Sequence, residues 1–489
     1  MNDNNPDILE QAGDFNLNVC QIVSYRMDGE SNEPVTLDII PIIQAIELTE
    51  DIFNNCIMGR ITVIDGQDFR SVLPITGLEK LELSFNTPGM QGFNYIREEG
   101  FPFHIYKIDA MAPIEPRAQL YNIYFTSREM FYNNMVRVNQ SFTGPTEEAV
   151  NTILRNFKYL NCKKKFYYEP TKNNEKYVIP NLRPFRSIHT LAETALSANY
   201  DNAGYLFYEN ANGYFFRSIE SLLAISGTAR PSIFAYNSQP SNIKDDRGLN
   251  NVVEDLKNVI KYEFDRPVNT LNMLGEGMYG SKLLTIDSFN RTFNEQTYSY
   301  QREFGKSFHT EHVDGNKSSF KFTLPWSNFE DSNTILSDFS DAKFMVTSNT
   351  RKIHNNNEFV KGEDYLQKRL TQRLSLQNVN VTLNVYGNTL LHAGDIITFN
   401  LPLYRPVGDT GSGQANPHFA GRYMIMSIKH IISPPDNKHE MIIKCMKDAV
   451  RTEYPIERDT NTLRYPDFIQ KTESLLDAEG NFLEVNYVD

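Results

Sequence analysis

An internal repeat constrains this chain more than any other feature of its sequence. The segment Leu-Glu-Leu-Ser-Phe-Asn-Thr-Pro at 81–88 aligns with Asp-Ile-Ile-Thr-Phe-Asn-Leu-Pro at 395–402, an offset of 314 residues. Two further segments align at a constant offset of 320 residues. The first pairs Phe103, Ile105 and Ile108 with Tyr423, Ile425 and Ile428, and the second pairs Tyr121, Ile123 and Phe125 with Met441, Ile443 and Cys445.

The change of six residues between the two offsets falls in one loop, at 89–102 in the first copy and 403–422 in the second. A register that holds across strands, with the length change confined to a loop, is typical of duplicated domains. Chance alignment of two alternating segments is the competing interpretation. If duplication is correct, Phe85 and Phe399 should be equivalent and should both point into a core.

The repeated regions have the period of β-structure. Apolar residues alternate with polar ones through 57–63, 81–85 and 121–125, and again from 379 to 446. Short alternating runs separated by Gly, Pro and Asn turns are typical of barrels or sandwiches. The sequence therefore predicts a mainly β chain with an α+β insertion, that is, two tube-like β-barrel domains plus a small α+β domain.

Between the repeats the pattern becomes helical in two places. Pro145 precedes two glutamates and an apolar face at 150–157, and Pro184 precedes a second such face at 188–195. Proline and acidic residues favour the first turn of a helix. Strand-like runs at 166–168 and 177–179 lie between the helices, and Asn-Ala-Asn-Gly at 210–213 predicts a hairpin. A further helix is expected at 364–374.

These changes in the hydrophobic pattern divide the chain into six expected regions. At nearly 500 residues it is too long for a single hydrophobic core. The regions are a flexible leader at 1–16, a first tube-like barrel at 17–141, an α+β domain at 142–255, a strand-rich intermediate region at 256–360, a second barrel at 361–450 and an extended acidic arm at 451–489.

Composition excludes several classes of protein. The net charge of −13 argues against general nucleic-acid binding, which depends on neutralising phosphates. Apolar runs are too short to span a bilayer, and the first residues lack the pattern of a signal peptide. The four cysteines, Cys20, Cys56, Cys162 and Cys445, have no metal-site spacing and are expected to be buried thiols.

Three motifs invite a chemical interpretation, and each has a simpler one. Gly-Glu-Gly-Met-Tyr-Gly at 275–280 fits a dinucleotide fingerprint but lacks a surrounding βαβ unit, so a glycine-rich turn is expected. His309 and His312 lack a third metal ligand nearby. The basic run at 163–165 is expected to be a solvated face rather than a phosphate track. We therefore predict no catalytic, cofactor-binding or metal-binding residue.

The chain resembles the baseplate hub proteins of contractile-tailed, T-even-like phages, and more distantly the hub part of type VI secretion spikes. The resemblance covers roughly 35–450. Its motifs concern packing and turns, not catalysis. The segments that carry it are 46–52, 59–65, Leu-Pro-Ile-Thr-Gly at 73–77, Pro-Phe-Arg-Ser-Ile at 184–188, Leu-Leu-His-Ala-Gly-Asp at 390–395 and Gly-Arg-Tyr at 421–423.

The resemblance implies a homotrimer whose six barrels form a ring that matches the sixfold tail tube. It implies a structural hub in the tail baseplate of a virion, assembled in the host cytoplasm. Its partners would be the tail spike, the tail tube or tube initiator and other baseplate proteins, and DNA would pass through its channel without specific binding. Two alternatives remain open: a hub with associated lysozyme-like cell-wall hydrolase activity, and a sugar-binding tail accessory protein.

Overall fold

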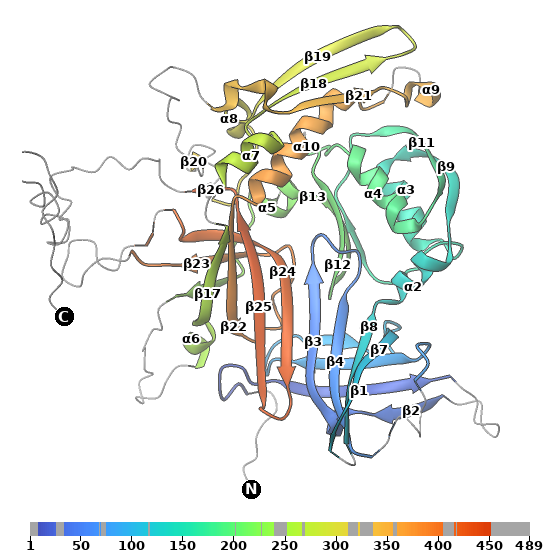
Figure 1. Cartoon of the computed structure of the whole chain (residues 1–489), viewed down its shortest axis with the longest axis vertical. Helices are drawn as coiled ribbons and strands as arrows, with labels where there is room; N and C mark the ends of the chain where they lie inside the picture. Colours follow the sequence, from blue (N-terminus) through green and yellow to red (C-terminus); the bar gives the residue numbers. More distant parts are fainter. Residues whose placement is uncertain are drawn as a thin grey trace, which may run out of the picture.

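The computed structural model describes residues 8–450 with internal gaps, and within that range the chain is mainly β (Figure 1). Most of the expected leader is described from residue 8 onward, whereas 1–7 and the whole expected arm at 451–489 lie outside the described residues. The internal gaps are 26–33, 68, 70–74, 116–117, 201, 226, 239–251, 267–268, 312–320, 323–335, 356–358, 404–414 and 417.

The N-terminal strands form a curled sheet, which we call the first β unit. Its strand order is β3-β4-β8-β7-β5-β1-β2, with β6 beside β5. The sheet wraps around an apolar core that includes Ile61, Phe85 and Ile123, all fully buried. Its elements are β1 (Asn16–Ser24), β2 (Val35–Asp38), η1 (Ile40–Ile42), β3 (Ile43–Asp51), β4 (Met58–Asp65), β5 (Lys80–Asn86), β6 (Phe93–Tyr95), β7 (Phe103–Glu115) and β8 (Ala118–Thr126).

A second curled sheet, the second β unit, has its own core around Leu383, Phe399 and Ile443. Its strand order is β17-β22-β25-β24-β23-β16. The unit therefore recruits two strands that precede the expected range of 361–450, because β16 and β17 pair with β23 and β22. Its strands are β16 (Phe234–Asn237), β17 (Val259–Arg266), β22 (Val379–Tyr386), β23 (Ile396–Asn400), β24 (Gly421–Ser433) and β25 (Lys438–Lys447).

The two units have the same strand order, with β3, β4, β8, β7 and β5 matching β17, β22, β25, β24 and β23. Their registers agree as well: Ile123 lies opposite Ile61 and Ile108, and Ile443 lies opposite Leu383 and Ile428. A bulge follows Ile105 in β7 and, 320 residues later, Ile425 in β24. Bulges are specific features of a sheet, and the interpretation of duplication over chance is therefore correct.

The alignment of one strand was wrong by two residues. Leu81 pairs with Phe103, whereas Ile397 pairs with Tyr423, so the offset in β5 and β23 is 316 rather than 314. Phe85 and Phe399 both point into cores, as expected, but they are not equivalent positions. Alternation has a period of two, so a shift by two residues leaves every side chain on the same face and cannot be seen in the pattern.

The α+β part lies between the two units in sequence and packs around a separate core that includes Val150, Ile188 and Tyr214. The expected hairpin is present, with β12 and β13 pairing from Tyr205 to Ser218. Its elements are α2 (Arg128–Met135), β9 (Val138–Pro145), α3 (Thr146–Arg155), β10 (Phe166–Tyr168), β11 (Asn174–Leu182), α4 (Pro184–Thr194), β12 (Tyr205–Asn210), β13 (Gly213–Ser218), α5 (Ile219–Leu223), β14 (Ala224–Ile225) and β15 (Thr228–Ala229).

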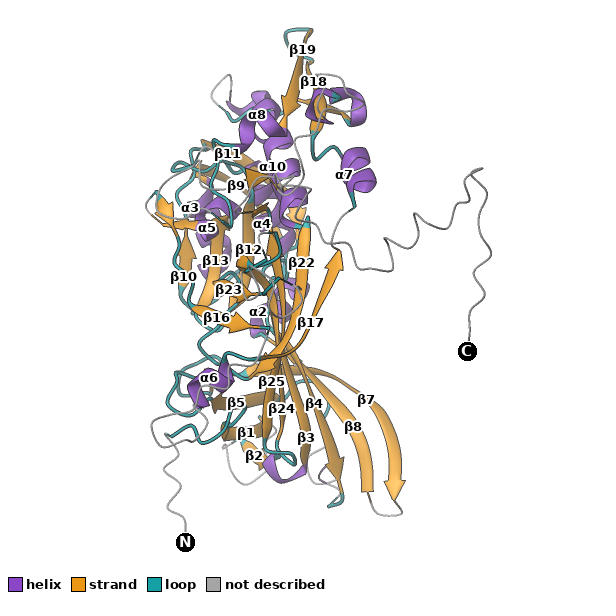
Figure 2. Ribbon diagram, turned by 90° about the vertical axis from the view of Figure 1, so that its left-hand side faces the viewer, coloured by secondary structure: helices purple, strands orange, loops and turns teal. Residues whose placement is uncertain are grey.

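A small sheet of β19, β18 and β21 projects at one end of the molecule and packs on the long helix α10 (Figure 2). The helix predicted at 364–374 is thus present and slightly longer. The remaining elements are α6 (Val252–Leu256), α7 (Thr270–Glu276), β18 (Gly280–Asp287), β19 (Thr292–Ser299), α8 (Tyr300–Phe304), β20 (Lys321–Phe322), η3 (Leu336–Asp338), η4 (Ser340–Ala342), β21 (Phe344–Ser348), α9 (Lys352–Asn355), α10 (Gly362–Leu376) and β26 (Ala449–Val450).

The composition also led to expectations about the cysteines and about membrane-spanning segments. All four cysteines are buried and free, as expected. Among the described helices, none combines the length and the apolar character needed to cross a bilayer.

Candidate functional site: the junction of the two β units

The two β units are joined edge to edge by backbone hydrogen bonds. Strand β24 of the second unit pairs antiparallel with β3 of the first, from Ser427 opposite Asp51 to Ile432 opposite Ile46. One run of strands therefore continues through both units, in the order β17-β22-β25-β24-β3-β4-β8-β7. Figure 1 shows β25, β24, β3 and β4 side by side across this junction.

A buried glutamate fixes the junction to its surroundings. Glu50 in β3 is fully buried, and its two carboxylate oxygens accept the backbone N–H groups of Ala211 and Ala393 at 2.8 and 3.1 Å. Its Oε1 lies 3.5 Å from Nδ1 of His392. Burial of the imidazole lowers the pKa of His392, but the Glu50 carboxylate more than offsets this and the pKa is raised overall. Glu50 thus connects β3, the β12–β13 turn and the turn before β23.

Two neutral histidines lie in the same interface. Nδ1 of His430 in β24 is 3.1 Å from Nε2 of His439 in β25, and both rings are fully buried. Burial lowers the pKa of His439 to about 3 and that of His430 well below its ordinary value. The His430 ring packs edge-on against Phe85 and Phe93 of the first unit. The rings therefore act as a neutral, packed bridge between the units.

The two strand edges that form the junction have counterparts elsewhere in the same sheet. Strand β7 is the equivalent of β24, and its stretch 107–113, which includes a bulge, corresponds to the stretch of β24 that pairs with β3. Strand β17 is the equivalent of β3. Within the described part of the chain, β17 pairs only with β22, and 107–113 pairs only with β8. The curled sheets are therefore open at matching edges.

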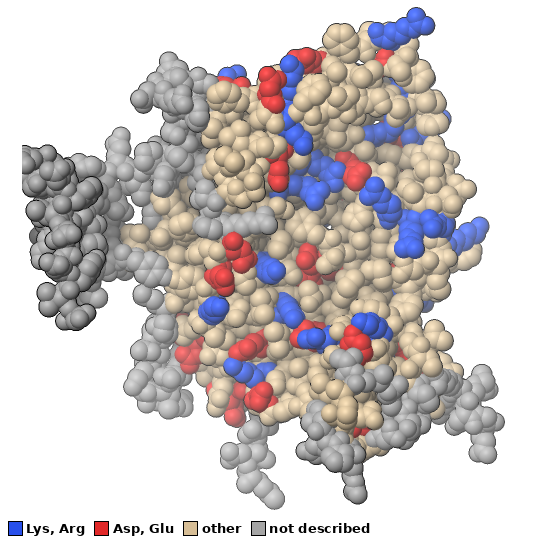
Figure 3. Space-filling view, in the orientation of Figure 1, with Lys and Arg blue, Asp and Glu red and all other residues tan. Residues whose placement is uncertain are grey.

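The face of this run that points away from the cores carries charges of both signs. Glu47 binds Lys429 across the junction at 2.8 Å and also contacts Arg60. Further pairs join Lys107 to Asp109 and Lys438 to Glu440. Figure 3 shows Lys and Arg interspersed with Asp and Glu over the lower half of the molecule, where the two β units lie.

The described part of the histidine motif at 309–312 is held to the end of β25 by buried polar contacts. Nδ1 of His309 lies 2.7 Å from the Asp448 carboxylate, and Nε2 lies 2.8 Å from the Phe304 carbonyl. The Glu311 carboxylate binds Lys447 Nζ at 2.7 Å, with both side chains fully buried. His312 lies outside the described residues, and no group of three or more potential metal ligands occurs among those that are described.

The basic run at 163–165 is only partly solvated. Lys163 and Lys165 are exposed, but Lys164 is buried between Glu209 at 2.5 Å and Glu129 at 3.1 Å. Burial raises the pKa of both carboxyls, and at Glu129 the Lys164 ammonium more than offsets this. The expectation of a solvated face was therefore wrong for the central lysine, because its two acidic partners are distant in sequence.

The glycine motif at 275–280 ends a helix and starts a strand. Gly277 caps α7 in the left-handed conformation, with φ of 86°, and β18 begins at Gly280. A side chain at 277 would meet Lys343 at 2.4 Å. The expectation of a turn is correct, and no strand–loop–helix phosphate cradle is formed there.

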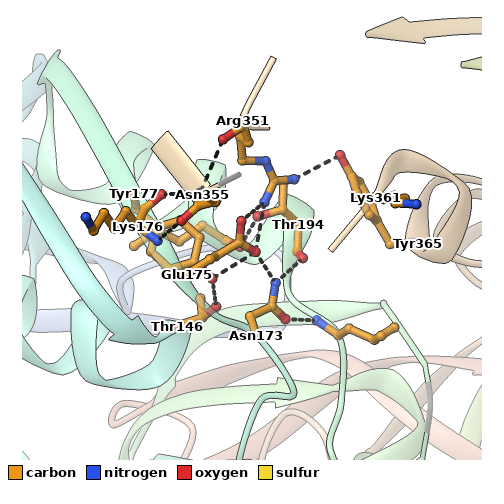
Figure 4. A network of polar contacts seen from close by, with 12 residues as sticks. Thr146, Asn173, Glu175, Lys176, Tyr177, Thr194, Arg351, Asn355, Lys361 and Tyr365 are labelled. Atoms are coloured by element: carbon orange, nitrogen blue, oxygen red, sulfur yellow. Dashed lines mark hydrogen bonds and ion pairs between the residues drawn. The ribbon is translucent and has the colours of Figure 1, made fainter. Parts of the chain in front are cut away.

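A polar network fastens the α+β part to the region before α10 (Figure 4). The buried carboxylate of Glu175 in β11 accepts from Arg351 at 3.1 and 3.2 Å and from Asn173 at 2.9 Å. Arg351 also donates to the Tyr365 hydroxyl of α10 at 3.3 Å. Sequence reasoning missed this network, because Glu175 and Arg351 lie far apart in the chain.

No protein-family model and no curated protein sequence matches the chain. The solved structures to which it is similar include a tail protein from Neisseria meningitidis MC58, with 9% identity over 89% of this chain and 97% of that chain, at a TM-score of 0.49. Another is the 43 kDa tail protein of prophage MuSo2 from Shewanella oneidensis, with 9% identity, coverage of 88% and 98%, and a TM-score of 0.46. A type VI secretion component from Escherichia coli follows, with 9% identity, coverage of 84% and 75%, and a TM-score of 0.36.

Proposed function

We propose that this chain is a structural hub of a phage-type tail baseplate, located in the virion. Three copies would form a symmetry adaptor that joins a sixfold tail tube to a threefold central spike. One observation carries the proposal: two equivalent β units are joined through strand edges whose counterparts, residues 107–113 of β7 and strand β17, pair with β8 and β22 alone among the described residues.

Repeating the same junction between chains would close a ring. If β7 of one copy meets β17 of the next as β24 meets β3 within the chain, three chains place six equivalent β units around one axis. Such a ring would pair these two edges in every chain, and heterologous interfaces produce rings when the rotation closes. The ring has sixfold pseudo-symmetry at the level of its β units and threefold symmetry at the level of its chains.

The register of such a junction follows from the internal one. Ile432 lies opposite Ile46 within the chain, and the equivalent positions are Pro113 and Tyr262, because β7 has a bulge between Asp109 and Ala112. Lys429 lies opposite Thr49, and the equivalent positions are Asp109 and Arg266, which are residues of opposite charge. Opposite charges across a strand pair favour it.

The channel of this ring would be lined by the polar face of the strand run. On that face Glu47 pairs with both Lys429 and Arg60, and Asp109 and Glu440 pair with Lys107 and Lys438. Cations that are already paired with carboxylates attract DNA phosphates less than unpaired cations do, so DNA would be held only weakly. Such a lining would serve passage of the genome.

The role we propose is structural rather than catalytic. Several buried charged groups of the described chain hold elements together: Glu50 accepts backbone N–H groups, and Lys447 pairs with Glu311 and donates to the Ala420 carbonyl. Incubation of the purified protein with peptidoglycan tests this directly. Release of soluble fragments, abolished by replacing a single acidic residue, would instead establish a hydrolase.

The decisive test is the mass of the chain mixed with its spike protein. A 3:3 assembly supports the adaptor, whereas a 6:3 or 1:1 complex contradicts it. Cysteine pairs test the edge pairing in the same assembly. Ala112 and Glu263 are the equivalents of Ile431 and Glu47, which lie opposite each other within the chain. Ala112→Cys with Glu263→Cys should therefore give disulfide-linked dimers and trimers, whereas Ala112→Cys with Tyr262→Cys, whose side chain faces the other side of the strand, should not. Trimers without the disulfide would retain the adaptor and reject this pair of edges.

A further inference from the structure

Positive charge is concentrated where helices α4 and α10 contact each other. Helices α4 and α10 contact each other, and α4 carries Arg186 and His189 at a spacing of three, whereas α10 carries Arg369 and Arg373 at a spacing of four. Residues three and four apart share one face of a helix. Arg186, Arg369 and Arg373 all lower the pKa of His189, after the larger effect of its burial, which places the four side chains in one electrostatic environment.

The described residues do not balance this charge. Glu193 is the acid of the cluster, and it lies 3.9 Å from Arg186. Nε of Arg369 is buried and meets no hydrogen-bond acceptor among the described residues. A buried donor of a charged group without an acceptor is costly. Lysine and arginine side chains gather over α10 and α4 in Figure 3, although the whole chain carries a net charge of −13.

The C-terminal part of the chain has the complementary composition. The stretch 472–489 contains five acidic residues and no Lys, Arg or His, with apolar residues between the acids. The last described strand, β26, ends at Val450, and its Ala449 packs in the same apolar cluster as Leu374, next to Arg373 in α10. Twenty-odd residues extended at about 3.3 Å each reach roughly 70 Å, so the acidic stretch can return to the cluster.

We propose that the basic cluster of Arg186, His189, Arg369 and Arg373 binds the acidic stretch 472–489 of this chain, from the same copy or from a neighbouring one. The apolar residues of the stretch would pack beside Leu366 and Leu370 of α10, which are partly buried. This inference does not depend on the trimeric ring.

A peptide fits this surface better than a nucleic acid. A nucleic-acid site needs a continuous track of cations, and affinity grows with each phosphate neutralised. Here the cations occupy two facing helix turns, with Glu193 among them, on a chain of strongly negative net charge. A short segment with acids two to five residues apart matches that size.

The test uses the full chain with one introduced cysteine, Gly480→Cys, carrying a fluorophore. The four native cysteines are buried, so the label goes to position 480. We expect the label's anisotropy to fall by about half in the variant Arg186→Glu/Arg373→Glu and, in the unmodified background, when salt is raised to roughly 1 M. Neutralising Glu473, Asp477, Glu479 and Glu484 to Gln or Asn should produce the same fall.

Matched controls make the outcome decisive. Both reversed arginines are exposed, and reversing the exposed Lys158 and Lys163 instead should leave the anisotropy unchanged. Unlabelled peptide 472–489 should compete with the labelled stretch. Independence of protein concentration assigns the contact to one copy, and concentration dependence assigns it to a neighbour. An unchanged anisotropy in both the cluster and the stretch variants overturns the proposal, as does displacement by a 20-nucleotide DNA at lower concentration than by the peptide.

Discussion

The ring of Phe125 lies directly over Gly59 on the paired strand. A Cβ atom at position 59 would meet Cζ of that ring at 2.1 Å and the Glu47 carbonyl oxygen at 2.6 Å. The equivalent pair in the second β unit is Val381 and Cys445. In the first unit a glycine without a side chain faces the large ring of Phe125. In the second unit two side chains of medium size, Val381 and Cys445, fill the equivalent place in the core.

This relationship predicts a rescue by double substitution. Gly59→Val should lower the free energy of unfolding by about 3 kcal/mol, because overpacking forces the ring and backbone apart. Adding Phe125→Cys, which copies the pair of the second unit, should restore part of that loss. Urea denaturation of the three variants measures the coupling. A double variant that is less stable than Gly59→Val would contradict the equivalence of the two pairs.

A second glycine should be equally intolerant for another reason. A Cβ at Gly387 would lie 2.0 Å from Nδ1 of the buried His439. Gly387→Ala should therefore cost about 2 kcal/mol or more of unfolding free energy. Gly275→Ala in α7 is the matched control, since nothing lies within 4 Å of its Cβ position, and it should be neutral or stabilising by up to about 1 kcal/mol. Thermal unfolding of both variants decides the matter.

Breaking the buried Lys447–Glu311 pair should lower the free energy of unfolding, because the remaining charge would be buried without its partner. Lys447→Met leaves the Glu311 carboxylate buried without its ammonium and should cost about 3–5 kcal/mol. Lys447→Met/Glu311→Gln should recover much of this, because the amide oxygen can still accept the N–H of Arg422, now 2.7 Å away. The control is Lys261→Met, whose pair with Glu263 is two-thirds exposed and should change stability by less than about 0.5 kcal/mol. Equal losses in all three variants would exclude this account.

The neutral histidines at the junction should make the fold sensitive to acid. His430 and His439 have folded pKa values below the ordinary 6.5, so the unfolded chain takes up protons that the folded chain refuses. Their contribution is complete above pH 6.5 and falls as the pH is lowered toward about 3. Between pH 6.5 and 5, His430→Gln should reduce the loss of stability by about 1.4 kcal/mol per pH unit. Urea midpoints at three pH values test this, and an unchanged slope would speak against it.

His392 should show the opposite dependence on pH. Its pKa is raised by Glu50, so its protonated form contributes stability that is complete below pH 6.5 and lost as the pH rises through the folded pKa. The destabilisation caused by His392→Gln should therefore be larger at pH 6 than at pH 8.5. Guanidinium denaturation at the two values measures the difference. A larger cost at pH 8.5 would mean that the Glu50–His392 contact does not set the charge of the ring.

The repeat was predictable from sequence where side chains alternate strongly. Ile123 and Ile443 were matched correctly, along with the neighbouring strands β7 and β24. The equivalence of β4 with β22 was missed, because Gly59 and Val381 share no property visible in a pattern. Strand β17 was assigned to an intermediate region, since its partner β22 follows it by more than a hundred residues and nothing local indicates that pairing.

The polar centres were harder to predict than the strands. Glu50, His392 and Ala211 come from three separate regions of the chain and meet only in the folded structure. His309 attracted attention as a metal ligand, yet its partners are Asp448 and a backbone carbonyl. A motif shows which groups are neighbours in sequence, whereas burial and pairing depend on distant residues.

The hydrogen bonds between β24 and β3 also set how force crosses the molecule. Six consecutive residue pairs lie along the strands, from Ser427–Asp51 to Ile432–Ile46. A pull along the strand axes loads all of these bonds together, whereas a pull across them would break them one after another. The junction therefore resists a pull along the strands better than a pull across them. The two β units of one chain should move together when force is applied along the strand axes.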